Sequence, residues 1–119
     1  MKDGRFKGLV EPIPRSVLLM PFYEKKARDT FKELQHPSNA TKKAIMLETW
    51  HAGGRIYYTS LEEILKQKDP TLTSEAIKEQ VKELVRDRLL WGAIGKGGMV
   101  FLTDGPGKEV MIFFDEKRE

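Results

Sequence analysis

The most regular hydrophobic pattern in the chain covers residues 73–90, TSEAIKEQVKELVRDRLL. Its aliphatic side chains recur at steps of three and four residues, the spacing that places them on one face of an α-helix; they are Ile77, Val81, Leu84, Val85 and Leu89. Thr73 and Ser74 belong to the residue types that cap a helix start, and Gly92 lies just past the expected end. The pattern predicts an amphipathic helix that organises the rest of the chain.

Two helices are expected in the first half. Residues 21–35 begin with a proline, which suits the first turn of a helix. Their apolar residues form one stripe that should pack on the rest of the domain or on a second copy; they are Tyr23, Ala27, Phe31 and Leu34. Residues 40–51 follow a capping Ser38 or Asn39 and end at a double glycine. This second helix is apolar on more than one side, which predicts a central position between packing partners.

Shorter elements complete the pattern. Residues 55–59 are β-prone, and Ser60 with Glu63 forms an S-x-x-E capping box for a helix over 61–67. After Trp91, glycine-rich turns alternate with apolar runs that predict strands over 99–103 and 110–114. We expect residues 1–20 to form a basic arm and residues 115–119 a solvated tail, which leaves 21–114 as one domain.

The order helix, short strand, helix, turn, helix, hairpin over residues 40–103 resembles the winged helix-turn-helix fold. The stretch 72–90 resembles a recognition-helix segment, and Phe101-Leu102-Thr103 followed by Gly107-x-x-Val110 is similar to the end of many small regulators' wings. The Gly105-Pro106-Gly107 segment interrupts that pattern. In those regulators a helix usually follows, whereas residues 110–114 predict a strand. The expected fold class is α+β: a three-helix core with a β-hairpin wing, plus an additional N-terminal helix.

This resemblance implies double-stranded DNA binding, with the recognition helix in the major groove and the wing on the neighbouring backbone. The candidate DNA-binding residues on the helix and at the wing tip are Thr73, Ser74, Lys78, Lys82 and Lys96. Weaker phosphate-binding candidates are Lys42, Lys43 and Arg55. A small transcriptional regulator, or an accessory factor of a replication or mobile-element system, would use such a domain, and a homodimer would place two recognition helices on adjacent half-sites.

The charge pattern of the 73–90 helix leaves the mode of contact open. A basic stripe at four-residue steps, Lys78, Lys82 and Arg86, runs beside an acidic stripe, Glu75, Glu79, Glu83 and Asp87. Pairs three residues apart can neutralise each other on a solvated helix, and the carboxylates would repel phosphate. Three interpretations follow: base reading by this helix, DNA contact mainly by arm and wing, or a winged-helix protein-interaction module with little DNA binding.

Composition narrows the remaining classes. The chain has 119 residues, a formal net charge of +3, whose excess lies in residues 1–36, and no cysteine. Without cysteine and with two isolated histidines, His36 and His51, we expect no metal site and no cofactor. No nucleophile motif or phosphate loop is present, so a non-catalytic protein is expected. The longest strongly apolar run, residues 17–20, is far short of the ~20 residues that span a bilayer, and no signal-peptide core follows the basic start, so we expect a cytoplasmic protein with no membrane partner. Trp50 and Trp91 are expected to pack in the core or at a hinge rather than to stack on bases.

Overall fold

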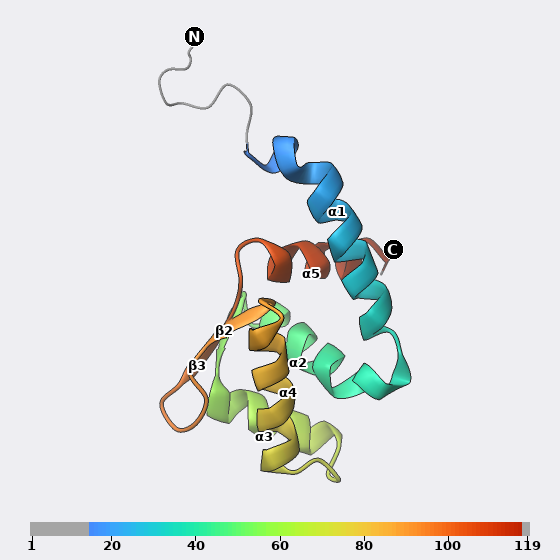
Figure 1. Ribbon diagram of the computed structural model, residues 1–119. Coiled ribbons are helices and arrows are strands. Elements are labelled where there is room, and N and C mark those ends of the chain that lie inside the picture. Colours follow the sequence, from blue (N-terminus) through green and yellow to red (C-terminus); the bar gives the residue numbers. More distant parts are fainter. Residues whose placement is uncertain (1–14, 118–119) are drawn as a thin grey trace.

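A computed structural model describes the backbone of residues 15–117 and the side chains of residues 25–115. The described chain folds as α+β, with five α-helices, a short 3-10 helix and a three-stranded antiparallel sheet (Figure 1). In chain order the elements are α1 (Arg15–Leu34), η1 (Pro37–Asn39), α2 (Ala40–His51), β1 (Arg55–Tyr57), α3 (Tyr58–Lys68), α4 (Ser74–Arg86), β2 (Leu90–Gly92), β3 (Met99–Leu102) and α5 (Pro106–Lys117).

The sheet has the strand order β1-β3-β2, so the hairpin strand β3 lies in the middle. Side chains alternate between its two faces, as strand geometry requires. Val100 and Leu102 of β3 and Leu90 of β2 point into the core and are buried. The core lies between this inner face and helices α2, α3 and α4, which contribute Ile45, Met46, Leu61, Leu65, Ile77, Val81 and Leu84.

Helix α2 lies at the centre of the molecule, as its apolar residues on more than one side predict. It contacts each of the other four α-helices and the sheet, and Ile45 and Met46 are fully buried. On its far side α1 packs against α5 (Figure 1), through Phe31, whose ring meets that of Phe114 edge-on at a centroid distance of 4.8 Å. The described part of the first helix's apolar stripe, Ala27, Phe31 and Leu34, therefore packs on the domain itself.

The organising helix is present, but it ends at Arg86 rather than at residue 90, and Leu90–Gly92 forms strand β2. Gly92 does not close it. Arg88 adopts the left-handed conformation, with φ of 66°. The Arg88 N–H donates to the Val85 carbonyl and the Leu89 N–H to the Leu84 carbonyl, both at 3.0 Å. This is a Schellman ending with arginine at the position where glycine is usual, which is why the sequence pattern misplaced the end.

The strand expected over residues 110–114 is wrong: these residues lie in helix α5. Pro106 occupies the first turn, where a proline needs no hydrogen-bond donor. The Thr103 side chain accepts a hydrogen bond from the Gly107 N–H at 2.8 Å and so caps the helix. A Cβ atom at Gly107 would collide with the carbonyl oxygen of Leu89, so glycine is required there. Gly105 lies in a turn, as expected, but Pro106 and Gly107 form the start of a helix.

Three smaller boundaries also differ from expectation. Helix α1 begins at Arg15, so residues 15–20 are helical rather than part of an arm, and Pro21 lies inside the helix. Strand β1 ends at Tyr57 and α3 begins at Tyr58, so Ser60 lies inside α3 and forms no capping box. Helix α5 continues to Lys117 into the expected tail. Residues 1–14 of the expected arm lie outside the described residues.

The order α2-β1-α3-α4-β2-β3 and the sheet topology are compatible with a winged-helix layout. The sequence had suggested one departure from that layout, a strand over residues 110–114 where a helix usually follows the wing. The structure has helix α5 there. Of the helices that the structure describes, none has the length and apolar character needed to cross a membrane.

Replacing Arg88 with glycine should stabilise the fold. A non-glycine residue in the left-handed region costs ~1–2 kcal/mol, and the greater flexibility of unfolded glycine offsets ~0.5–1 kcal/mol of the gain. We expect Arg88→Gly to raise the free energy of unfolding by ~0.5–1 kcal/mol, measured by urea denaturation. The control Arg86→Gly, inside the same helix, should lower it by up to ~1 kcal/mol. Equal losses in both variants would contradict the assigned ending.

Candidate nucleic-acid interface

The two hydroxyl residues at the start of α4 serve the fold. The Thr73 side chain caps the helix, because its Oγ1 accepts a hydrogen bond from the Ala76 N–H at 3.1 Å. The Ser74 hydroxyl donates to Oε1 of Glu62 at 2.9 Å and accepts from Nζ of Lys66 at 2.6 Å. Both partners lie on α3, so Ser74 fixes the angle between α3 and α4. The structure therefore gives Ser74 a structural task instead of leaving it exposed for a ligand.

Glu62 is the centre of this small polar cluster. Partial burial alone would raise its pKa, but the groups around the carboxylate, Tyr58, Ser74 and Lys66, outweigh burial and leave the pKa of Glu62 lowered. Lys66 forms an ion pair with Glu62 at 3.1 Å. The hydroxyl of Tyr58 is buried beside the carboxylate without a hydrogen bond of good geometry, and its burial raises the pKa of Tyr58. The cluster keeps Glu62 charged at neutral pH.

Two of the weaker phosphate candidates also have partners within the protein. Lys42 forms a 2.7 Å ion pair with Glu83 of α4, and this hydrogen bond lowers the pKa of Glu83. Lys43 donates to Oε1 of Gln35 at 2.9 Å, and its ammonium lies 5.8 Å from the centre of the Phe114 ring. Both lysines hold α2 against neighbouring helices, and neither lies with the hairpin.

The contacts of α4 separate its two charged stripes. Lys82 lines a groove shared with strand β2, and Lys78 lies one helical turn earlier on the same side. Glu83 points the other way, toward Lys42 of α2. Glu79 lies between these sides and pairs loosely with Lys82 at 3.8 Å, where both side chains are exposed. Lys82, and by helical spacing Lys78, therefore lie on the hairpin side of α4, whereas Arg86 of the same stripe lines the cleft beside α1. Of the acidic stripe, Glu83 is neutralised by α2.

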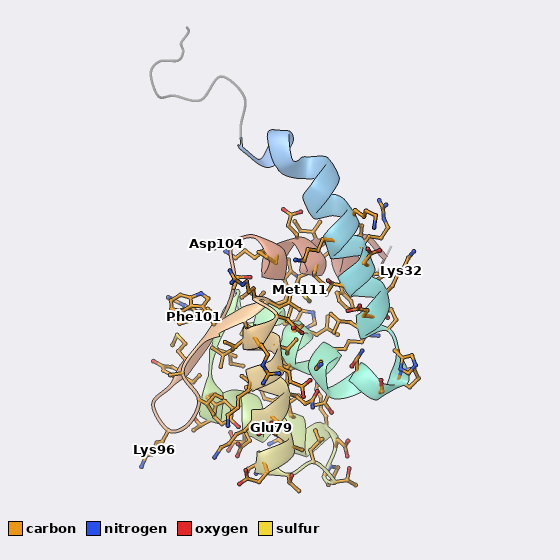
Figure 2. The ribbon with its side chains drawn as sticks, in the orientation of Figure 1. Lys32, Glu79, Lys96, Phe101, Asp104 and Met111 are labelled. Atoms are coloured by element: carbon orange, nitrogen blue, oxygen red, sulfur yellow. The ribbon has the colours of Figure 1, made fainter. Side chains whose placement is uncertain are left out.

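The sheet and its hairpin carry the remaining candidates. Lys96 is exposed at the hairpin tip, as Figure 2 shows, and Arg55 is exposed on β1. Arg55 is the charged residue of β1, and Lys96 is the charged residue of the β2–β3 hairpin. Neither element contains a carboxylate. The structure thus places Lys78, Lys82 and Lys96 around the α4–hairpin side of the molecule, with Arg55 on the outer face of the sheet.

The outer face of the sheet holds residues that the sequence did not reveal. Trp91 of β2 was expected to be packed away, yet 55% of its surface is exposed. Its ring stacks on that of Phe101, with centroids 4.5 Å apart and planes inclined by 15°. Alternation along β3 could have indicated an outward Phe101, because Val100 and Leu102 take the inner face. Trp50, by contrast, is half-buried and donates to the carboxylate of Asp115 on α5 at 3.1 Å.

Two hollows lie beside helix α4. A groove of about 140 Å³ runs between α4 and the hairpin; it is lined mainly by apolar residues, including Val85, Trp91 and Ile94, with Lys82 at its side. A larger cleft of about 470 Å³ lies between α1, the end of α4 and the start of α5. Its lining mixes acidic and basic side chains, so it does not favour one sign of ligand charge. Among the described side chains, residues 25–115, no cluster of His, Asp or Glu is placed to hold a metal ion.

No protein-family model, curated protein or solved structure matches this chain.

Neutralising Glu62 should reveal a pH-dependent contribution to stability. Its pKa in the folded protein is lowered, so its contribution is present above the unfolded-state value of ~4.3 and is lost as pH falls through the lower folded-state value. We expect Glu62→Gln to be less stable than the unmodified protein at pH 7, with the difference shrinking below pH ~4, measured by thermal melts. The control Glu63→Gln, on the exposed side of α3, should show little difference. A pH-independent loss in Glu62→Gln would contradict the charged cluster.

Proposed function

We propose that this protein is a non-catalytic double-stranded DNA-binding protein that uses a winged-helix layout. Helix α4 would enter the major groove, and the β2–β3 hairpin would lie along the adjacent backbone. One observation carries the proposal: Lys82 of α4 lines the groove beside the hairpin whose tip carries Lys96, while Glu83 is turned to Lys42 of α2. Cations from two elements therefore converge on one side.

The remaining carboxylates set the strength of this interaction. Glu79 is exposed next to Lys82, and their 3.8 Å pair must open before the lysine can meet phosphate. An exposed pair of this kind is worth ~0–1 kcal/mol, so opening it is a small barrier compared with a phosphate contact. If Lys78, Lys82, Lys96 and Arg55 each neutralise one phosphate, the logarithm of affinity should fall with the logarithm of salt with a slope of roughly −3 to −4.

The proposal can be tested by fluorescence anisotropy with a labelled duplex at two or more salt concentrations. We expect Lys78→Ala and Lys82→Ala each to weaken binding and to reduce the salt slope by ~0.9, because each variant removes one phosphate contact. Lys96→Ala should act in the same direction.

Lys32→Ala is the matched control. It removes the same charge from an exposed position on α1, on the side of the molecule away from Lys96 (Figure 2), and should leave the slope unchanged. Affinity near millimolar at low salt would overturn the proposal and favour a protein-interaction module. An equal loss of DNA affinity in Lys32→Ala would show that the lysine variants act only through the net charge of the protein.

A further inference from the structure

The outer face of the sheet combines aromatic rings with positive charge. Its residues form two rows across the strands: Arg55, Phe101 and Trp91 are aligned in one row, and Tyr57 and Met99 in the next. Tyr57 is 56% exposed and Trp91 55% exposed. The side chains of the inner face fill the core, so the rings of the outer face do not contribute to core packing. Their exposure is unexplained by the fold.

Trp91 is stacked on one neighbouring ring and is still 55% exposed. The neighbouring ring is that of Phe101 of the central strand β3. Strand β2 is an edge of the sheet, and Trp91 also lines the groove between α4 and the hairpin at that edge. At about 140 Å³ this groove is well below the ~300–1,000 Å³ of a whole-ligand pocket. It has room for one flat ring.

The charges around this face indicate what the ring belongs to. Arg55 lies at one end of the aromatic row, Lys82 lines the groove at the other end, and Lys96 lies at the hairpin tip. The three strands and the hairpin loop contain no carboxylate. Flat rings joined by a chain of negative charges are the chemistry of unpaired nucleic-acid bases, which stack on aromatic side chains while cations track the phosphates.

We propose that the outer face of the sheet, centred on Trp91, binds the unpaired bases of single-stranded DNA by stacking. This activity goes beyond duplex binding, since it uses the sheet rather than insertion of α4 into a groove. A duplex with an unpaired arm would then contact α4 and the sheet together. Such a substrate occurs wherever a duplex is opened.

The first experiment compares three DNA probes with the full chain: a blunt duplex, the same duplex with a thymine-only single-stranded arm, and the arm alone. We expect the forked probe to bind more tightly than the blunt duplex. Trp91→Thr, which keeps a β-prone residue in the strand, should weaken binding of the arm by about 5- to 150-fold, the range for loss of one base–aromatic stack. The single-stranded arm should lose far more affinity than the blunt duplex, which separates this test from that of the α4 lysines.

Ile112→Ala is the matched control, because it removes another exposed apolar side chain, 43% exposed on α5. It should change no affinity. Tyr57→Thr provides a second variant on the opposite strand and should weaken the single-stranded arm in the same direction. Circular dichroism of each variant verifies that it is folded. If Trp91→Thr is unfolded, the binding of Tyr57→Thr decides the test.

Tryptophan fluorescence reports directly on stacking, because a purely structural role of Trp91 would not make its emission respond to bound DNA. Binding of the arm should quench Trp91, and Trp91→Phe should keep most of the affinity but lose that quenching. Equal binding of the arm by Trp91→Thr and the unmodified chain would overturn the proposal. So would light scattering that shows a dimer converted to a monomer by Trp91→Thr, because the face would then be covered by a second copy.

Discussion

The hydroxyl group of Thr103 joins the parts of this fold that are far apart in sequence. It donates to the carbonyl of Arg88 at 2.8 Å, at the end of α4, and accepts from the N–H of Gly107 at 2.8 Å, at the start of α5. Thr103 itself follows strand β3, and its backbone N–H donates to the Leu89 carbonyl at 3.1 Å. The end of α4, the sheet and the start of α5 therefore meet at one side chain. Because α5 in turn supports α1, the position of the N-terminal helix depends on this junction.

The same junction explains which features could be predicted from the sequence. The apolar faces of α2 and α4 follow from their periodicity, and the structure confirms both helices. The end of α4 and the start of α5 could not be predicted in this way. An arginine took the left-handed position expected for glycine, and a Gly-Pro-Gly segment opened a helix instead of a turn. The apolar run at 110–114 fits a strand or a buried helix equally well on periodicity alone. The long-range contacts of Thr103 and Gly107 decided the outcome, and no local pattern contains them.

The candidate interface was only partly visible in the sequence for a related reason. The charged stripes of α4 are evident from residue spacing, but spacing does not say which neighbour each stripe meets. Lys42 neutralising Glu83, and Ser74 bound to Glu62, are contacts between helices that are close only after folding. Together with the Thr73 cap and the bond from Lys43 to Gln35, these contacts give four of the eight candidate residues partners within the protein. Conversely, Trp91 was missed because a lone tryptophan in an apolar segment gives no sign of which face of a strand it occupies.

A sheet with exposed aromatic rings and two open edges is prone to recruit further strands from neighbouring molecules. Here β1 and β2 form those edges, and each has three residues. Strand β1 stops at Tyr57 because helix α3 begins directly after it. Strand β2 stops at Gly92, whose φ is 129°. Each edge therefore offers too few aligned backbone groups to template another strand. The brevity of the edge strands lets the protein expose Trp91 and Tyr57 to solvent while limiting aggregation through the sheet.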